Sequence, residues 1–258
     1  MNKMILAAVS LLGLGAVAAP ASAQDAAPAA PAPTPAFTIN GGATLVSDYR
    51  FRGISQTDRR FAVQGTFTVG HSSGFYATVW GSSIDDYVAA GSDQEIDLIA
   101  GFKKSFGNTT FDAGVLYYYY PGSGGANTDF VEPYISIAQA FGPATIKATA
   151  NYAPKQKAIA SPGHLKDDNL YLAGDLSFTV PETTVGATAH IGHSFGPSYL
   201  TAGTSFSKEY TDWSVGLTYG VKNLVFGVSY VDTDGDFITP SGRNASKAGI
   251  VASVGVAF

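Results

Sequence analysis

The stretch NLYLAGDLSFTV at residues 169–180 alternates between two kinds of side chain. One set is apolar and comprises Leu170, Leu172, Leu176, Phe178 and Val180. The residues between them are mostly small or polar, namely Tyr171, Ala173, Asp175, Ser177 and Thr179. Because successive side chains of a β-strand point to opposite faces, this period of two predicts a strand with one apolar and one polar face.

The same alternation recurs along the chain, in segments separated by clusters of Gly, Pro, Asn, Asp and Ser. Twelve such segments are predicted as strands: 37–49, 60–70, 74–84, 94–105, 109–120, 129–141, 144–154, 169–180, 184–194, 207–219, 223–232 and 247–258. Their connections alternate between tight turns, such as Gly107-Asn108, and long links, such as 233–246. An even strand count with alternating short and long connections is typical of an all-β, transmembrane antiparallel up-and-down β-barrel, and this is the fold class that we predict.

The composition agrees with this fold and excludes several function classes. Of the 258 residues, 45% are hydrophobic and 14% are charged, against a usual charged share of about 25%. The net charge is −5 and no basic run occurs, which argues against a nucleic-acid-binding protein. The chain has no cysteine, so it holds no disulfide and no thiolate metal site.

The N-terminal segment predicts export. Residues 1–23 combine Lys3, an apolar run and the motif Ala21-Ser22-Ala23, as is typical of a cleaved signal peptide. The alternative is a membrane anchor, but the apolar run is shorter than the roughly 20 residues that a spanning helix needs. Residues 24–36 are rich in Ala and Pro and are expected to form a periplasmic linker before a barrel at 37–258.

The apolar face of the predicted strands carries aromatic residues near both ends. Near the tight turns these are Phe37, Phe75, Phe102, Phe111, Phe141, Phe178, Tyr219 and Phe258. Near the long links they are Tyr49, Phe61, Tyr117, Tyr119, Tyr152, Trp213 and Tyr230. Two aromatic belts on an apolar face are typical of a barrel in a membrane. A soluble β-sandwich or soluble barrel, with its apolar face turned inward, is the alternative.

The polar face is predicted to line a pore. The candidate lining residues are Asp48, Arg50, Tyr76, Trp80, Glu95, Asp97, Asp112, Glu132, Tyr134, Lys147, Tyr171, Asp175 and His190, with Lys103 and Tyr118 on the same face. Six acidic side chains in this set outnumber the three basic ones, which predicts a mild preference for cations. Twelve strands lie between the barrels that side chains fill and those that hold a water-filled channel. The alternative is therefore a plugged interior, in which the opposite charges pair with each other.

Arg50 and Arg52 flank Phe51 at the start of the first long link. Two guanidinium groups at this rim are candidates for binding an anionic solute or a lipopolysaccharide phosphate. In the alternative, these arginines pair with Asp48 or Asp58 and order the loop.

Motifs for catalysis and metal binding are weak. His193 beside Ser194 suggests a base and a nucleophile, but adjacent strand residues point to opposite faces. The run from Asp232 to Asp236 lacks the glutamate of an EF-hand, which leaves loose calcium binding as an alternative. We therefore expect no enzyme activity, catalytic residue, metal site or cofactor. A barrel hydrolase would need a Ser and a His from separate strands.

One long stretch resembles a known family. It comprises SDYRFRGISQT at residues 47–57, AVQG at 62–65, HSSGFY at 71–76 and Trp80-Gly81-Ser82. These motifs are similar to those of the TorF family, conserved exported proteins of proteobacteria that are assigned as porins. The resemblance implies an outer-membrane barrel that acts as a pore, and it carries no substrate and no catalytic residue.

These observations predict a porin of the bacterial outer membrane through which small hydrophilic solutes diffuse. The expected partners are outer-membrane lipid and lipopolysaccharide, the barrel assembly machinery acting on the terminal Phe258, and the solutes themselves. No nucleic-acid partner is expected. The runner-up is a plugged structural or adhesion barrel that interacts through its outer loops.

Overall fold

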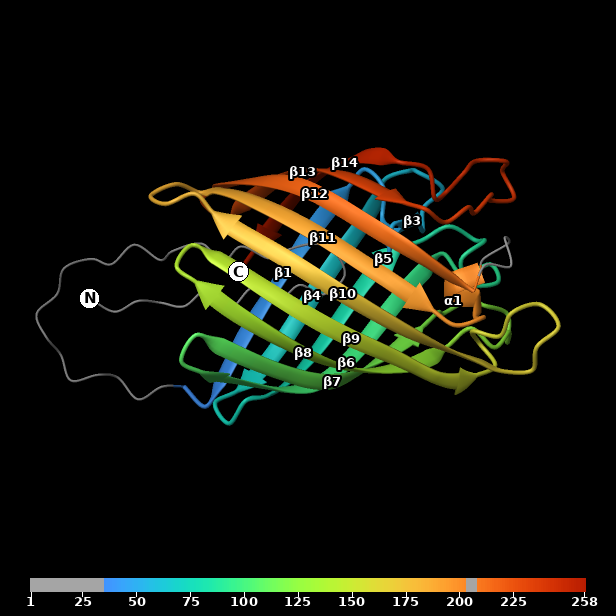
Figure 1. Cartoon of the computed structure of the whole chain (residues 1–258), viewed down its shortest axis with the longest axis horizontal. Helices are drawn as coiled ribbons and strands as arrows, with labels where there is room; N and C mark the ends of the chain where they lie inside the picture. Colours follow the sequence, from blue (N-terminus) through green and yellow to red (C-terminus); the bar gives the residue numbers. More distant parts are fainter. Residues whose placement is uncertain (1–34, 203–207) are drawn as a thin grey trace, which may run out of the picture.

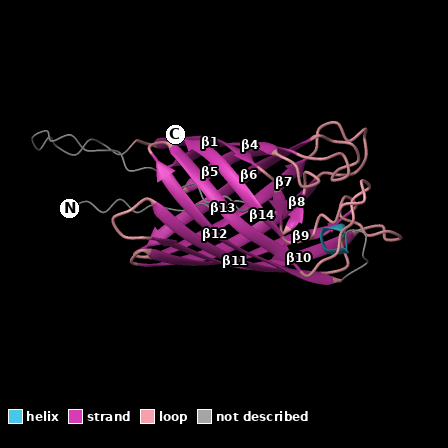
Figure 2. Ribbon diagram, turned by 90° about the horizontal axis from the view of Figure 1, so that it is seen from above, coloured by secondary structure: helices cyan, strands magenta, loops and turns pink. Residues whose placement is uncertain are grey.

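A computed structural model describes residues 35–202 and 208–258 of the chain. Twelve antiparallel strands form a closed barrel (Figures 1 and 2). In chain order they are β1 (Phe37–Val46), β4 (Ala62–His71), β5 (Phe75–Ser83), β6 (Gln94–Phe106), β7 (Thr109–Tyr119), β8 (Phe130–Phe141), β9 (Ala144–Gln156), β10 (Asp167–Thr179), β11 (Val185–Phe195), β12 (Glu209–Val221), β13 (Leu224–Thr233) and β14 (Gly249–Ala257). The predicted fold class and strand number are confirmed.

Three short elements lie in the long loops. Strands β2 (Arg50–Phe51) and β3 (Ile54–Ser55) pair with each other in the first loop, and helix α1 (Tyr199–Ala202) follows β11. Within the described residues no helix has the length and apolar character to cross a membrane. The predicted signal peptide and most of the predicted linker lie outside the described residues.

The barrel closes between its first and last strands. β1 pairs with β4 on one side and with β14 on the other, and every other strand pairs with its neighbours in sequence. The terminal Phe258 completes the seam, because its N–H donates to the Gly41 carbonyl at 2.9 Å and its own carbonyl accepts from Gly41 N–H at 3.0 Å. The twelve barrel strands therefore leave no unpaired edge that could pair with another chain.

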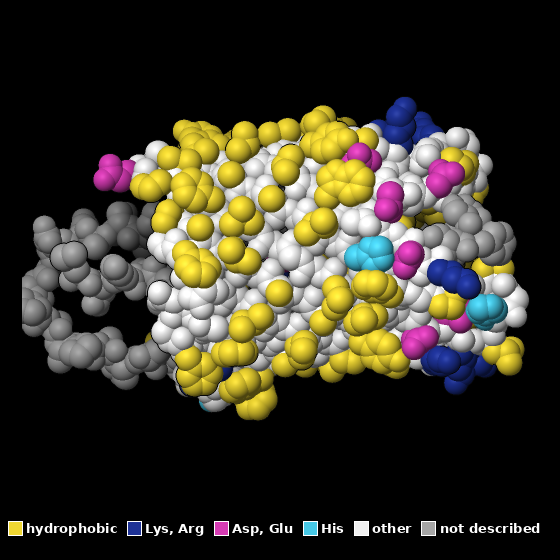
Figure 3. All heavy atoms as spheres, viewed as in Figure 1, with side chains coloured by type: hydrophobic (Ala, Val, Ile, Leu, Met, Phe, Trp, Pro, Cys, Tyr) yellow, Lys and Arg dark blue, Asp and Glu magenta, His cyan; other side chains and the backbone are white. Residues whose placement is uncertain are grey.

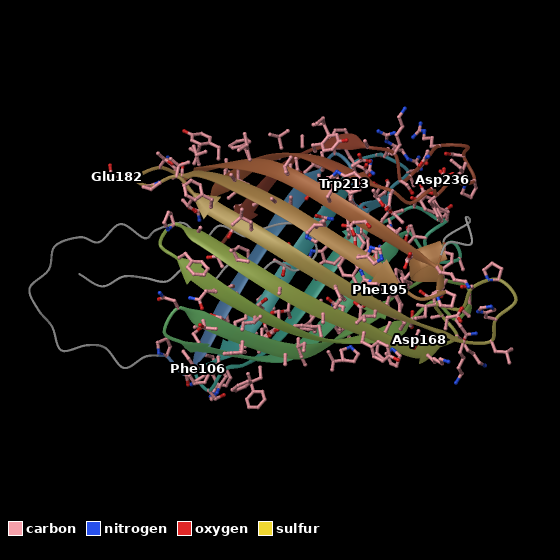
Figure 4. All side chains as sticks on the ribbon, viewed as in Figure 1. Phe106, Asp168, Glu182, Phe195, Trp213 and Asp236 are labelled. Carbon is pink, nitrogen blue, oxygen red and sulfur yellow. The ribbon has the colours of Figure 1, made fainter. Side chains whose placement is uncertain are left out.

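The connections sort to opposite ends of the barrel. Tight turns lie at the end that holds Phe37 and Phe258, and the long loops and α1 lie at the other end (Figure 1). We call these the short-turn end and the long-loop end. Figure 4 shows Phe106 and Glu182 at the short-turn end and Asp168 and Asp236 toward the long-loop end.

The outside of the barrel is apolar. Large hydrophobic side chains on alternate strand positions are exposed, including Ile135 at 64% and Leu217 at 57%. In Figure 3 apolar side chains cover the wall, whereas charged side chains gather toward the long-loop end. An outward apolar band excludes the soluble alternative with its apolar face turned inward, because here the polar face forms the interior.

The predicted aromatic belts have one exception. All the aromatic residues predicted near the tight turns are exposed, and near the long loops Phe61, Tyr117, Tyr119, Tyr152 and Tyr230 are exposed while Trp213 is half-buried. The prediction was wrong for Tyr49, which is only 2% exposed. Barrel pairing of β1 ends at Val46 rather than at the predicted residue 49, and the chain then turns into the interior.

Candidate functional site

The interior has a half near the short turns that is partly open to solvent. We call it the short-turn half and define it by Tyr76, Lys103, Asp112, Tyr134, Lys147, Asp175 and His190. Its charged side chains retain 13% to 27% exposure. Lys103 Nζ lies 3.3 Å from Asp112 Oδ2, and Lys147 Nζ lies 3.9 Å from Asp175 Oδ2. These pairs therefore form a wet, charged wall.

Hydrogen bonds tie this wall to its aromatic residues. The Tyr76 hydroxyl donates to Asp112 Oδ1 at 2.8 Å and also hydrogen bonds to the Tyr134 hydroxyl. The Lys103 ammonium lies 5.4 Å from the centre of the Tyr76 ring. The side chains come from β5, β6, β7 and β8, so the contacts hold four consecutive strands in register.

His190 lies on the border between the two halves of the interior. Its Nδ1 lies 2.7 Å from Asp175 Oδ1, and its Nε2 lies 3.1 Å from Asp212 Oδ1. The Tyr171 hydroxyl donates to Asp212 Oδ2 at 2.9 Å and lies 2.9 Å from His190 Nε2. This chain of polar groups connects the exposed wall to the buried interior nearer the long loops.

The other half of the interior is dry. We call it the long-loop half and define it by Trp80, Glu95, Asp97, Tyr118, Glu132, Asn169, Tyr171 and Asp212, all of them buried. Glu95 and Asp97 of β6 and Glu132 of β8 supply three buried carboxyl groups to this half. Both Asp97 oxygens are buried without a hydrogen-bond partner among the described residues. Such a carboxylate is costly unless a charge or donor reaches it.

The first long loop, residues 47–61, enters this half. The Tyr49 hydroxyl donates to Glu95 Oε1 at 3.1 Å, and its ring lies 5.4 Å from that of Trp80. The Phe51 ring meets the Tyr118 ring edge-on at 6.0 Å. The loop therefore supplies aromatic side chains to the core of the long-loop half.

Arg52 reaches from the first loop to strands β8 and β10. Its Nη2 lies 2.6 Å from Glu132 Oε1, and its Nη1 donates to Asn169 Oδ1 at 3.0 Å. Burial acts to lower the pKa of Arg52, but the charge and hydrogen bonding of Glu132 act to raise it, and the resulting pKa is above the ordinary arginine value. The guanidinium is therefore a permanent positive charge among buried carboxylates.

Arg50 is held closer to its own loop. Its Nε donates to Asp48 Oδ2 at 2.6 Å, and its Nη1 donates to the carbonyls of Gly53, Ala245 and Lys247. Neither guanidinium thus lies free at the rim. Arg50 pairs with Asp48, as in the loop-ordering alternative, whereas Arg52 pairs with Glu132 and not with Asp48 or Asp58. Anion binding by these arginines stays a prediction, and it would require them to leave these carboxylates.

The structure places the predicted lining residues in two groups. Tyr76, Asp112, Tyr134, Lys147, Asp175 and His190 lie in the short-turn half, and Asp48, Arg50, Trp80, Glu95, Asp97, Glu132 and Tyr171 are buried in or under the first loop. Sequence reasoning missed Asp212 and Asn169, although Asn169 alternates in step with Tyr171. It also missed the loop residue Arg52 as an interior residue, because loops carry no periodicity.

No catalytic arrangement is formed by the pair that the sequence singled out. Ser194 is buried and accepts from Asn169 Nδ2 at 3.0 Å, whereas His193 Nδ1 lies 2.9 Å from Thr211 Oγ1. In the described part of the chain no group of three or more His, Asp or Glu side chains is placed to hold a metal ion.

Sequence comparison identifies the family. The model of a family described as "Bacterial protein of unknown function (Gcw_chp)" matches residues 29–258. The chain belongs to this family. No curated protein matches it. Family membership therefore gives no activity.

Structure comparison found outer-membrane channels that are similar to this chain. The NanC porin has a TM-score of 0.56 at 14% identity, over 86% of this chain and 99% of that chain. An outer-membrane channel from Pseudomonas putida F1 has a TM-score of 0.48 at 10% identity, over 87% of this chain and 96% of that chain. The outer-membrane channel DcaP of Acinetobacter baumannii has a TM-score of 0.43 at 12% identity, over 86% of this chain and 97% of that chain. The likeness to NanC confirms the closed antiparallel barrel.

Proposed function

We propose that this protein is a porin of the bacterial outer membrane, of the TorF type, that lets small hydrophilic solutes diffuse through its interior. The observation that carries the proposal is the pairing of an apolar outer wall with a charged, solvent-exposed short-turn half. A barrel in lipid needs an apolar outer wall, and a path for polar solutes needs a charged interior that solvent reaches. No covalent step is involved. The proposal includes export through the cleaved segment 1–23 and assembly through Phe258.

The charge of the interior supports a preference for cations. The acidic side chains of the two halves are Glu95, Asp97, Asp112, Glu132, Asp175 and Asp212. The basic ones are Lys103, Lys147 and His190, together with Arg52 inserted from the first loop. An excess of carboxylates along a narrow path lowers the energy of a passing cation and raises that of an anion.

The first loop sets the size of the solutes. Because residues 47–61 place Tyr49, Phe51 and Arg52 in the long-loop half, the constriction lies there rather than at the short turns. Small solutes are therefore the expected cargo, and their passage depends on how far this loop yields.

Planar-bilayer recording of the purified, refolded chain without residues 1–23 tests the channel. We expect discrete conductance steps and, under a salt gradient, a reversal potential of the sign that marks cation preference. A reversal potential of the opposite sign would overturn the preference for cations. Absence of current from protein shown to be folded and inserted would overturn the channel.

The buried contacts of the first loop favour a second candidate, a plugged barrel that acts through its outer loops. A pocket of about 390 Å³ lies among those loops and is lined by Asp58, Arg60, Asp85, Asp86, Tyr87, Gly91, Thr239, Pro240 and Ser241. Asp58 holds its wall together by accepting from the hydroxyls of Thr239 and Ser241 at 2.9 Å. A folded protein that binds lipopolysaccharide and carries no current, even after Arg52→Ala, would favour this candidate.

A further inference from the structure

Arg52 occupies a site with the features of a guanidinium receptor. Glu132 and Asn169 each offer an oxygen to a different nitrogen of the group, at 2.6 and 3.0 Å. The Tyr171 ring centre lies 4.1 Å from the guanidinium carbon, and the Phe51 ring centre lies 4.7 Å from it. Two acceptors for a planar fork and aromatic faces beside it form the combination that distinguishes guanidinium from a compact ammonium.

The barrel wall holds this receptor in place without help from Arg52. Glu132 Oε2 accepts from the Tyr118 hydroxyl at 3.0 Å and from Asn151 Nδ2 at 3.3 Å. Asn169 Nδ2 donates to Ser194 Oγ and to the Phe195 carbonyl, both at 3.0 Å, and this fixes its oxygen toward the guanidinium. Since these partners belong to strands, we expect the receptor to keep its shape when the arginine side chain is absent.

The buried carboxylate of the site needs a positive partner. Glu132 has 0% exposure, and its Oε1 lies 2.6 Å from Arg52 Nη2. Removal of the Arg52 side chain would leave this buried carboxylate without its positive partner, which is unfavourable. A cation of matching shape that enters the site recovers that energy.

Arg52 has an unfavourable backbone conformation at the point where the loop enters the interior. Arg52 has a φ of 49°, in the left-handed region that a residue with a side chain rarely adopts. Gly53 follows with a φ of 80°, and a Cβ at this glycine would lie 2.8 Å from Asp212 Cβ. The contacts of the arginine side chain thus hold it there against the preference of its backbone.

We propose that the long-loop half contains a binding site for the guanidinium group of a small solute, which Arg52 of the first loop occupies as a tethered substitute. Only the statement that this solute permeates the barrel rests on the proposed channel function. Binding itself needs just the barrel wall. A guanidinium-bearing solute would displace Arg52 and open the constriction that this residue closes.

Chemical rescue of the full mature chain carrying Arg52→Ala tests the site. Guanidinium chloride at millimolar concentration is the probe, with sodium chloride and ammonium chloride at equal ionic strength as references. We expect a saturable upward shift of the thermal unfolding midpoint with guanidinium and no such shift with either reference, because a ligand that binds only the folded protein stabilises it. Since guanidinium otherwise destabilises proteins, an upward shift has the opposite sign to its general effect.

The double variant Arg52→Ala, Glu132→Gln is the matched control, because it keeps the cavity and removes the carboxylate. Loss of the upward shift in this variant would support the site. An equal shift there, or no shift in folded Arg52→Ala, would overturn it. If Arg52→Ala fails to fold, the refolding yield becomes the measurement, and we expect guanidinium to increase it several-fold over ammonium. A yield equal in the two salts would overturn the site.

Current measurements separate this proposal from the channel itself. Arg52→Ala protein that guanidinium stabilises but that carries no current would support the site and overturn the channel. Protein that conducts but shows no guanidinium shift would overturn the site and leave the channel standing.

Discussion

The two halves of the interior hold similar residues in opposite environments. In the short-turn half, ion pairs such as Lys103 with Asp112 keep part of their surface in water. In the long-loop half, the Arg52 and Glu132 side chains are 4% and 0% exposed. An exposed pair contributes little to stability, whereas removal of one partner from a buried pair leaves an uncompensated charge. Ion pairs of the same kind are therefore expected to contribute little to stability in one half and to be costly to break in the other.

Arg52→Ala should have the largest effect on stability. The substitution leaves Glu132 buried without its cation, and breaking a buried pair in this way costs about 3–5 kcal/mol. We expect the free energy of unfolding, measured by urea titration in lipid vesicles, to fall by about that amount. Arg60→Ala is the control from the same loop, since its side chain is 63% exposed, and it should cost about 1 kcal/mol or less.

Equal losses in the two arginine variants would contradict the distinction between a dry and a wet half. The same two variants also test this distinction by conductance, because only Arg52→Ala should raise it. Arg60 lies in the loop pocket and not in the interior constriction.

Gly53→Ala should have the next largest effect, because it disturbs the turn that inserts Arg52. A left-handed φ costs a residue with a side chain about 1–2 kcal/mol, and the contact with Asp212 adds an overpacking cost of about 1–3 kcal/mol. Gly91→Ala is the control, since Gly91 has a φ of 92° but nothing within 4 Å of its Cβ position. It should show the backbone cost alone. A loss for Gly53→Ala no larger than for Gly91→Ala would show that the loop yields at this contact.

The contrast between the halves also explains what the sequence can predict. Alternation along residues such as Leu170 to Val180 follows from strand geometry, so it predicts the strands and both faces of the wall. It also places Asp112 and Asp175 on the inner face, where the structure has them. The same rule wrongly places Tyr49 on the outside, because the chain leaves the barrel wall after Val46.

The dry half depends on contacts that no local pattern encodes. Arg52 meets Glu132 across 80 positions of sequence and Asn169 across 117. These partners lie on β8 and β10, and only the closed barrel brings those strands opposite the first loop. A charged pair in a loop motif is equally compatible with a solvated rim, so burial decides the role of Arg52 and the sequence does not show burial.

Asp97→Asn should not lower stability, unlike the other substitutions in the dry half. The carboxyl group is buried without a hydrogen-bond partner among the described residues, so its ionised form is costly, and a neutral amide avoids that cost. We expect the free energy of unfolding at pH 7 to be unchanged or to rise by about 1 kcal/mol. Glu132→Gln, at the same 0% exposure, is the matched control and should cost about 3 kcal/mol. A loss of similar size in both variants would show that the folded protein supplies Asp97 with a cation.

Lys103→Met should change ion selectivity more clearly than stability. Its Nζ lies 3.3 Å from Asp112 in the partly exposed half, so the loss in free energy of unfolding should stay within about 1 kcal/mol. Removing this positive charge leaves the carboxylate free to attract cations, and the reversal potential should move further toward cation preference. Lys104→Met is the adjacent control, because the exposed Phe102 and Phe106 on either side place residue 104 on the outer wall. Lys104→Met should leave the reversal potential unchanged, so an equal shift in the two variants would place the ion path outside the short-turn half.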